Sequence, residues 1–262
     1  MATAIKDYYD LALAARLAEE IRAVDKNFDE KAFSGIIKKG IRGTELKERL
    51  NLYAEALYAG FNEDYPGSLK SLQRFLPRPL LSTEGMFNEG YHLYPVSQYI
   101  ENYGLSHFDA SVAFIYELTQ RFTGEFCIRP FLQKEPVKIQ KLMLKYTRDK
   151  NVHVRRFASE GIRPMLPWAK KFMGFAENPA PAFEVLSRLR KDPEKYVQKS
   201  VANHIRDYIK LNPAVTLPLL KEWLDEDHPA TNWIARHALR PKISAPGGKL
   251  QKELASLIAK VR

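Results

Sequence analysis

The feature that most constrains this 262-residue chain is an imperfect internal repeat in its second half. The segment IRPFL at 128–132 recurs as IRPML at 162–166, which is 34 residues later, and IRD at 205–207 follows 43 residues after the second copy. Repeats of this length with a variable period are typical of HEAT-like units, each of which is a pair of helices. Stacked pairs bury a continuous core, so the repeat predicts a solenoid.

The apolar residues indicate that the chain is helical before the repeats as well. Leu46, Leu50, Tyr53, Leu57 and Phe61 recur at intervals of three and four, which places them on one face of a helix. Runs of β-branched residues are short and fall within the same period, so no strand-rich segment is expected. The sequence therefore predicts an all-α fold.

Two positions carry the signature of a helix start. Thr44 precedes an apolar run, and Ser106 is followed three residues later by Asp109, which is a variant of the capping box. We expect helices to begin at both positions. Clusters of Pro and Gly, as at 164–167, are expected to interrupt the helices.

A second recurring pattern concerns basic residues. An apolar residue with a basic residue two positions later occurs at 154–156 (VRR) and again at 197–199 (VQK) and 234–236 (IAR). Because the spacing follows the repeat, we expect each segment to open the second, inner helix of a pair. Inner helices line the concave face of a solenoid, which is its usual binding surface. The predicted fold is thus an all-α, HEAT-like repeat solenoid with a concave basic face.

The positive charge is concentrated in the same region. Between 134 and 210 lie 18 of the 41 Lys and Arg residues but 8 of the 31 Asp and Glu residues, which accounts for the whole formal charge of +10. A concentrated basic region attracts polyanions such as nucleic acid, although many basic faces are only solvated. The charge supports a nucleic-acid partner and does not prove one.

We expect a single HEAT-like domain at 1–245, with N-terminal helices at 1–105 and the repeats at 106–245, followed by a basic tail at 246–262. A chain of this length can bury a large core as one unit, and a self-capped solenoid is expected to be a monomer. The one cysteine, Cys127, allows no intrachain disulfide and fits a reducing cytosol. No uninterrupted apolar run of about 18 residues occurs, so no membrane span is expected.

Several common chemistries find no support in the sequence. His107 and Asp109 have the His-x-Asp spacing of a non-haem iron site, but Asp109 is better explained as a helix-start residue. The six histidines show no i, i+4 pair, so neither a metal nor another cofactor is predicted. The sequence also has no glycine-rich phosphate loop and no nucleophile elbow. Carboxylates and aromatic residues beside the repeats remain.

Four segments resemble a known family, in the expected order. They are FTGEFCIRPFL at 122–132, VRRFASEGIRPMLPWA at 154–169, YVQKSVANHIRD at 196–207 and TNWIARHALR at 231–240. Together they resemble the AlkC branch of the AlkC/AlkD alkylpurine DNA glycosylases, a superfamily of HEAT-like repeats. Some relatives carry an immunoglobulin-like domain after the repeats, and no such domain is expected in this chain.

The resemblance implies a DNA repair glycosylase that hydrolyses the N-glycosidic bond of cationic N-alkylated bases, such as 3-methyladenine, without a deep base-flipping pocket. Glu125 and Asp207 would be the acidic pair at the lesion, with Trp168 as the aromatic residue beside them. Phosphate contacts are expected from Arg155, Arg156, Arg163, Lys199, Arg206, Arg236 and Arg240. The implied partner is double-stranded DNA containing alkylated bases, in the nucleoid of a bacterial cytoplasm.

The chemistry of such a lesion agrees with this assignment. A base alkylated on a ring nitrogen is already cationic, so it leaves without a strong general acid, and the sugar becomes an oxocarbenium-like cation. Two carboxylates can stabilise that cation and orient a water, and an indole face adds cation–π attraction.

Other interpretations stay open at this point. Asp207 could balance a basic helix face, Glu125 could be a solvated helix residue, and Trp168 could pack between repeats. The alternatives for the whole protein are a non-catalytic HEAT-repeat protein that binds unusual DNA structures and a HEAT scaffold that binds an acidic protein.

Overall fold

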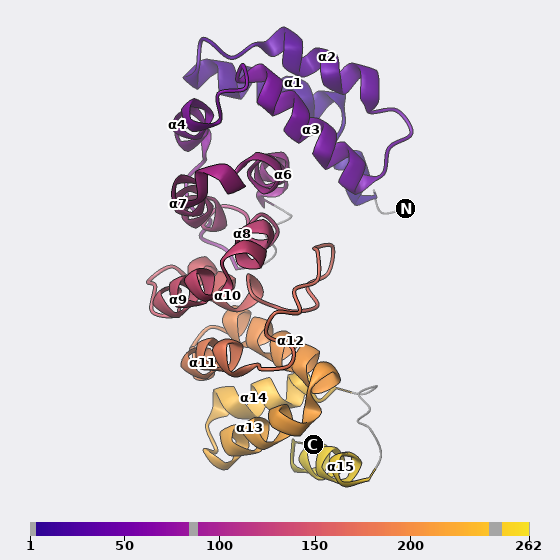
Figure 1. Cartoon of the computed structure of the whole chain (residues 1–262), viewed down its shortest axis with the longest axis vertical. Helices are drawn as coiled ribbons and strands as arrows, with labels where there is room; N and C mark the ends of the chain where they lie inside the picture. The colour runs from indigo at the N-terminus through magenta and orange to yellow at the C-terminus, as the bar shows by residue number, and fades with distance from the viewer. Residues whose placement is uncertain (1–3, 84–88, 241–247, 262) are drawn as a thin grey trace. The chain divides into compact units, whose positions relative to one another are not determined.

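The computed structural model describes residues 4–83, 89–240 and 248–261. Within these ranges it contains fourteen α-helices and no β-strands (Figure 1), which confirms the predicted all-α fold class. None of the helices in the described part of the chain is long and apolar enough to cross a membrane. The helices form two compact units, Met1–Pro130 (unit 1) and Phe131–Arg262 (unit 2).

Unit 1 contains six α-helices among its described residues. They are α1 (Leu11–Val24), α2 (Glu30–Gly40), α3 (Leu46–Gly60), α4 (Tyr65–Phe75), α6 (Tyr94–Tyr103) and α7 (Phe108–Thr119). Helix α3 packs against α2 and α6, while α4 contacts α1 and α7. The apolar stripe predicted at 46–61 forms the buried face of α3, because Leu50, Tyr53 and Leu57 are fully buried and Phe61 is nearly so.

The two predicted helix starts differ in detail from the structure. The residue before α3 is Glu45 rather than Thr44, and the capping box joins Glu45 to Glu48. Ser106 lies within a short 3-10 turn, and α7 begins after it at Phe108 without a side-chain cap. In both cases the helix was expected correctly, and its first residue lies one or two positions further along the chain.

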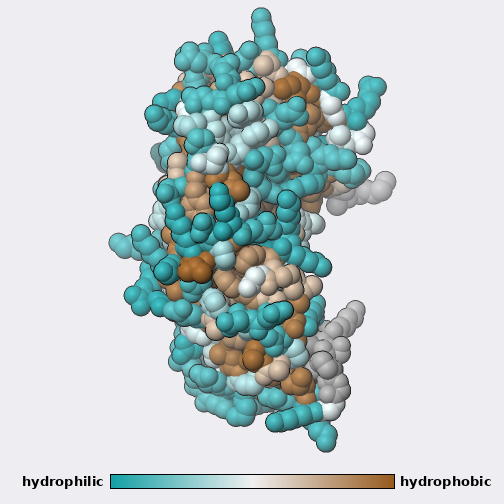
Figure 2. Space-filling view, in the orientation of Figure 1, coloured by the Kyte–Doolittle hydropathy of each residue, from teal (hydrophilic) through white to brown (hydrophobic). Residues whose placement is uncertain are grey.

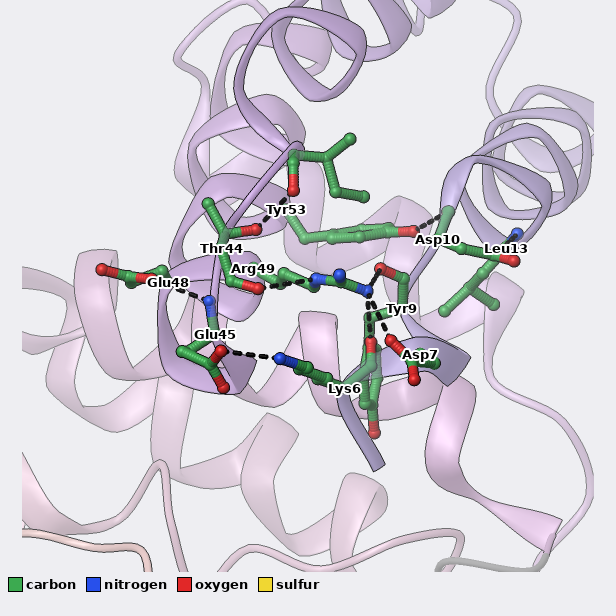
Figure 3. Close-up of polar contacts among 11 residues, drawn as sticks. Lys6, Asp7, Tyr9, Asp10, Leu13, Thr44, Glu45, Glu48, Arg49 and Tyr53 are labelled. Atoms are coloured by element: carbon green, nitrogen blue, oxygen red, sulfur yellow. Dashed lines mark hydrogen bonds and ion pairs between the residues drawn. The ribbon is translucent and has the colours of Figure 1, made fainter. Parts of the chain in front are cut away.

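Arg49 on α3 fastens the N-terminal segment to unit 1 (Figure 3). Its guanidinium donates a hydrogen bond to the carbonyl oxygen of Lys6 at 2.7 Å and lies 3.6 Å from the carboxylate of Asp7. Tyr53, one turn further along α3, donates its hydroxyl to the carbonyl oxygen of Asp10. Both carbonyl oxygens also accept a backbone N–H, from Tyr9 at Lys6 and from Ala14 at Asp10, so each side chain adds a second bond to an acceptor that is already paired.

Unit 2 is a series of helix pairs. Its helices are α9 (Pro136–Tyr146), α10 (Val152–Glu160), α11 (Ala180–Leu189), α12 (Lys195–Leu211), α13 (Pro213–Asp225), α14 (Pro229–Ala238) and α15 (Lys249–Val261), and α8 (Arg129–Lys134) contains the division between the units. Helix α10 packs against α12 and α12 against α14, so the second helix of each pair contacts the second helix of the next. These are the helices that the three apolar-basic segments were expected to open.

The two copies of the IRP motif do not have the same structure. The copy at 128–132 leads into α8, whereas the copy at 162–166 lies in turns after α10 and begins a loop that continues to Pro179. Pro164 corresponds to Pro130, which lies within α8, but the second copy alone is followed directly by a proline, Pro167, which disfavours helical backbone at the residue before it. The repeat in the sequence therefore predicts the helix pairs correctly, but its two copies differ in local structure.

The predicted basic tail at 246–262 contains a helix, α15. Leu254 and Leu257 are buried, and α15 contacts α13 and α14. Lys260 forms an ion pair with Asp225 on α13 at 2.6 Å. The C-terminal residues of the chain thus extend the helical packing of unit 2.

The predicted domain limits stay a prediction. The boundary expected at 245 lies outside the described residues. The expected single domain at 1–245, with its division after 105, includes residues of both compact units. The concave basic face of the predicted solenoid is likewise left as a prediction.

The surface is largely hydrophilic on the face that Figure 2 shows, where apolar residues gather in separate patches. Large apolar side chains are nevertheless exposed at particular places. Trp168 and Met173 are two of them, and both lie in the loop that follows α10. An exposed tryptophan on a loop is unusual enough to mark this segment as a candidate for function.

Candidate functional site

A buried cluster of charged residues lies where α10 and α12 pack together. Asp207 on α12 is 6% exposed, Glu160 at the end of α10 is 3% exposed, and Arg163 in the turn after α10 is 8% exposed. Arg163 donates from Nε to Oδ2 of Asp207 at 3.0 Å and from Nη2 to Oδ1 at 3.3 Å. Its Nη1 donates to Oε2 of Glu160 at 2.9 Å. One guanidinium is therefore shared between two buried carboxylates.

The protonation of this cluster follows from its burial. Loss of water raises the pKa of Asp207 above its ordinary value, and Arg163 opposes that rise while Glu160 adds to it. For Arg163, burial acts to lower the pKa, but the attraction of Glu160 and Asp207 outweighs burial and leaves the pKa above its ordinary value. Arg163 is a permanent cation, and its charge and hydrogen bonds favour the ionised form of Asp207.

The cluster extends along α10 to Arg156. Nη2 of Arg156 lies 3.8 Å from Oε1 of Glu160, which is the oxygen that Arg163 does not bond. The guanidinium of Arg156 also lies over the ring of Tyr196, 5.0 Å from its centroid. Glu160 is thus held between two arginines, and sequence reasoning missed it because a glutamate in a helix gives no sign of burial.

The loop after α10 is compact and firmly anchored. The backbone N–H of Phe172 donates to the carbonyl oxygen of Pro164 at 3.0 Å, which closes the intervening residues into an Ω-like loop. Phe172 and Phe175 are buried and pack edge to face with ring centroids 5.1 Å apart. At the start of the loop, the backbone of Met165 hydrogen-bonds to Asp207. Figure 1 shows the segment as the long coil that follows α10.

Trp168 occupies this loop in a strained conformation. Its side chain is 58% exposed, and its backbone φ is +62°, in the left-handed region that favours glycine. A bulky residue held there costs about 1–3 kcal/mol and persists only where the surroundings impose it. Trp168 therefore does not serve mainly to fill the core between repeats, and its position three residues after Met165 connects it to the Asp207 cluster.

Glu125 lies in unit 1, in the turn between α7 and α8, and is 6% exposed. The hydroxyl of Thr123 donates to Oε2 of Glu125 at 3.0 Å and accepts from the backbone N–H of Glu125 at 3.2 Å. Next to it, Phe126 stacks on Tyr94 with centroids 4.9 Å apart. Glu125 is thus a buried turn residue rather than a solvated helix residue. Its predicted convergence with Asp207 joins two units and stays a prediction.

A group of cations without acidic partners lies on α12 and at the end of α14. Lys199 and Arg206 are on α12, and Arg240 follows α14. Arg206 donates to the carbonyl oxygen of Ala238 at 3.3 Å, and Arg240 donates to the side chain of Asn203 at 3.3 Å. Within the described residues, none of the three cations forms an ion pair. Burial lowers the pKa of Arg206 and the charge of Arg240 lowers it further, while the negative charge of Asp207 opposes the change.

His237 on α14 lies among the same cations. Its ring stacks on Trp233 with centroids 4.7 Å apart, and Nζ of Lys195 is 4.6 Å from the Trp233 centroid. Burial, followed by repulsion from Arg240 and Lys199, lowers the pKa of His237 to about 4. Mutual repulsion of this kind is relieved by a bound anion, so the face suits a polyanion. Sequence reasoning predicted the cations of this face as phosphate contacts but did not single out His237, although the i, i+4 spacing of Trp233 and His237 was visible.

The remaining predicted phosphate contacts have different surroundings. Arg155 on α10 forms a two-point ion pair with Asp192, from Nε at 2.7 Å and from Nη2 at 3.3 Å. Arg236 is exposed on α14. The phosphate contacts expected for Arg155, Arg156, Arg163, Lys199, Arg206, Arg236 and Arg240 stay predictions. The structure of unit 2 brings Asp207 together with Arg163 and with the base of the loop that carries Trp168.

Comparison with known proteins adds three findings. Residues 123–241 match the family described as DNA alkylation repair enzyme. The chain is 33% identical over 237 residues to the uncharacterized protein YhaZ of Bacillus subtilis (strain 168), and this alignment covers 90% of the chain and 64% of that relative. The chain therefore spans less than two thirds of the length of this curated relative.

The structure is similar to that of the Pseudomonas fluorescens alkylpurine DNA glycosylase AlkC bound to DNA containing an abasic site analog. The TM-score is 0.86 at 33% identity, and the match covers 98% of the present chain and 69% of that chain. This similarity confirms the predicted HEAT-like helical-repeat fold.

Proposed function

Because the chain belongs to the AlkC-type family of DNA alkylation repair enzymes, we propose that it is a DNA glycosylase acting on duplex DNA with N-alkylated bases. The substrates are cationic lesions such as 3-methyladenine, and the reaction is hydrolysis of the N-glycosidic bond by a monofunctional enzyme. The observation that carries the proposal is Asp207, a buried carboxylate kept ionised by Arg163 beside a loop that exposes Trp168.

The chemistry needs a negative charge more than a proton donor. When the bond between C1′ and the base nitrogen breaks, its electron pair stays with the base and neutralises the charge that alkylation introduced. The sugar becomes an oxocarbenium-like cation, to which a water oxygen adds while a proton is lost. The carboxylate of Asp207 stabilises that cation and orients or deprotonates the water. A normal base carries no such charge and gains little from this site.

Two further residues complete the proposed site. Glu125 is the second acid at the sugar, and its hydrogen bonds to Thr123 fix the carboxylate in its turn. Trp168 offers an exposed indole face to a cationic base or sugar, an attraction of about 0.5–2 kcal/mol. The strain at Trp168 supports this role, because strained backbone is concentrated at functional sites.

DNA is bound through phosphates in this proposal. The cations on α12 and just after α14 that form no ion pair within the described residues, Lys199, Arg206 and Arg240, are the leading candidates, because a phosphate would relieve the repulsion between Arg206 and Arg240. Exposed Arg236 extends the same surface. The enzyme acts as a monomer in the cytoplasm of a bacterium, where it binds the nucleoid.

The experiment that tests the function is release of a methylated base. The purified protein is incubated in excess with a duplex containing one N-methylated purine, and the free base is separated by chromatography. Wild type should release it. Asp207→Asn should be slower by about 10²-fold or more, in line with the loss of one preorganised electrostatic group.

The matched control is Asp192→Asn. Asp192 is also a buried aspartate of unit 2 with a two-point arginine partner, but it lies in the turn between α11 and α12 and its partner is Arg155 rather than Arg163. Its variant should release base at nearly the wild-type rate when protein is saturating. A wild-type protein that binds the duplex and releases nothing would refute the proposal, as would equal losses in both asparagine variants.

A further inference from the structure

We propose that Arg163 and Glu160 are a positioning pair that sets the orientation and the ionisation of Asp207, which deepens the proposed function and depends on it. Neither residue needs to touch the substrate. Arg163 acts on the aspartate directly, and Glu160 acts through Arg163. This gives Arg163 a role inside the protein, in contrast to the phosphate contact expected from the sequence.

The geometry of Arg163 supports a positioning role. Its Nε and Nη2 each bond a different oxygen of Asp207, at 3.0 and 3.3 Å, which fixes the plane of the carboxylate as a single bond could not. Its Nη1 bonds Glu160 at 2.9 Å, so three nitrogens of one guanidinium are engaged on two sides. The side chains of all three residues are at most 9% exposed. An arginine held in this way cannot turn outward to a phosphate without removing the two-point partner of Asp207 and leaving Arg156, at 3.8 Å, as the ion-pair partner of Glu160.

The second carboxylate has a distinct effect on the charge of the site. An aspartate that is neutralised by one arginine offers little net attraction to a cationic sugar. Glu160 shares the positive charge of Arg163, so more of the negative charge of Asp207 remains available. Arg156, at 3.8 Å, limits this effect from the other oxygen of Glu160. Arg163 thus favours the charged form of Asp207, and Glu160 reduces the repulsion between Arg163 and a cationic transition state.

The charged and titratable groups that act on Asp207 come from the turn after α10, from α10 and from α12. Arg163 lowers the pKa of Asp207 and Glu160 raises it. On α12 itself, Arg206 and Tyr208 interact with Asp207 electrostatically. From α14, Arg240 acts on Arg206. The two members of the positioning pair therefore have opposite effects on the pKa of one carboxylate, and this is the property that the test measures.

The test is the pH dependence of base release. Single-turnover release from a duplex containing one N-methylated purine is measured from acid to neutral pH for wild type, Arg163→Gln, Arg163→Lys and Glu160→Gln, with spontaneous release subtracted. For Arg163→Gln, the acid limb of the profile should move to higher pH and the plateau should fall by about 10-fold or more. Arg163→Lys keeps the charge but not the two-point bond, so its acid limb should stay near wild type while its plateau falls.

Glu160→Gln should move the acid limb the other way, to lower pH, and its plateau should also fall because Arg163 then neutralises Asp207 more fully. Arg190→Gln is the control, since Arg190 pairs with Glu226 elsewhere in unit 2, and its profile should match wild type. The proposal is overturned if Arg163→Gln and Glu160→Gln shift the limb in the same direction or leave it in place. If Arg163→Gln does not fold, the profiles of Arg163→Lys and Glu160→Gln still test the proposal. An inactive wild type would instead refute the proposed function.

Discussion

The left-handed backbone at Trp168 predicts that a glycine variant will be more stable than an alanine variant at this position, which is the reverse of their order within a helix. Trp168 has φ +62° and is 58% exposed, so Trp168→Gly and Trp168→Ala both remove an indole that is largely in solvent. The two variants differ in one respect, because alanine keeps a Cβ in the left-handed region and glycine does not.

The expected difference follows from two opposing terms. A Cβ in the left-handed region costs about 1–2 kcal/mol. Glycine gives back about 0.4–1 kcal/mol because its unfolded chain has more freedom to lose. Trp168→Gly should therefore be more stable than Trp168→Ala by about 0.5–1 kcal/mol, or about 1–4 °C in Tm for a chain of this size. Base release should fall by a similar factor in both variants, since both lack the indole.

Chemical denaturation gives the free energy of unfolding, and single-turnover release gives the rate. The control is the same pair of substitutions at Lys141, an exposed position within α9, where alanine should be the more stable by about 1 kcal/mol. If alanine were equal to or better than glycine at position 168 as well, the residue would not be left-handed in solution. The inference of stored strain at the site would then be withdrawn.

Two further predictions concern the cations of α12 and α14. Arg206→Ala should reduce the slope of log affinity against log salt concentration by about 0.9 for duplexes of any sequence, whereas Arg190→Ala, whose arginine is already paired with Glu226, should leave it unchanged. An unchanged slope for Arg206→Ala would remove it from the interface. Because the pKa of His237 falls to about 4 in the folded protein, the unfolded chain binds more protons between pH 4 and 6.5, so stability should decrease on acidification across this window. His237→Gln should lessen that decrease, and parallel denaturation curves for the two proteins would contradict the assignment.

The parts of the fold that the sequence predicted are those in which local pattern and packing agree. The stripe that includes Leu50, Tyr53 and Leu57 required only the helical period, and the recurring apolar-basic segments located the second helix of each pair in unit 2. The loop at 161–179 was harder, because it shares the IRP motif with a segment that enters a helix. Its prolines signalled a break, but its closure depends on a hydrogen bond between Phe172 and Pro164 that no local pattern encodes.

The candidate site divides in the same way. Asp207 and Trp168 were found through their motif, whereas Glu160 was missed and Arg163 was expected at the phosphates. The reason is distance along the chain, since Arg163 meets Asp207 across 44 residues. A sequence shows that an arginine is present but not which acid reaches it. Burial turned this arginine from a candidate DNA contact into an internal counter-ion.

The pairing of buried acids with arginines also determines which cations of unit 2 are left without an ion pair. The basic window holds few acids, and several of them have arginine partners within unit 2: Asp192 pairs with Arg155, and Glu160 and Asp207 share Arg163. Each such pair withdraws one cation from the surface and stabilises the contact between successive helix pairs. The excess charge is therefore not spread evenly over the window. It falls on positions that form no ion pair within the described residues, such as Lys199 and Arg206, where a phosphate could bind a cation without displacing a carboxylate from it.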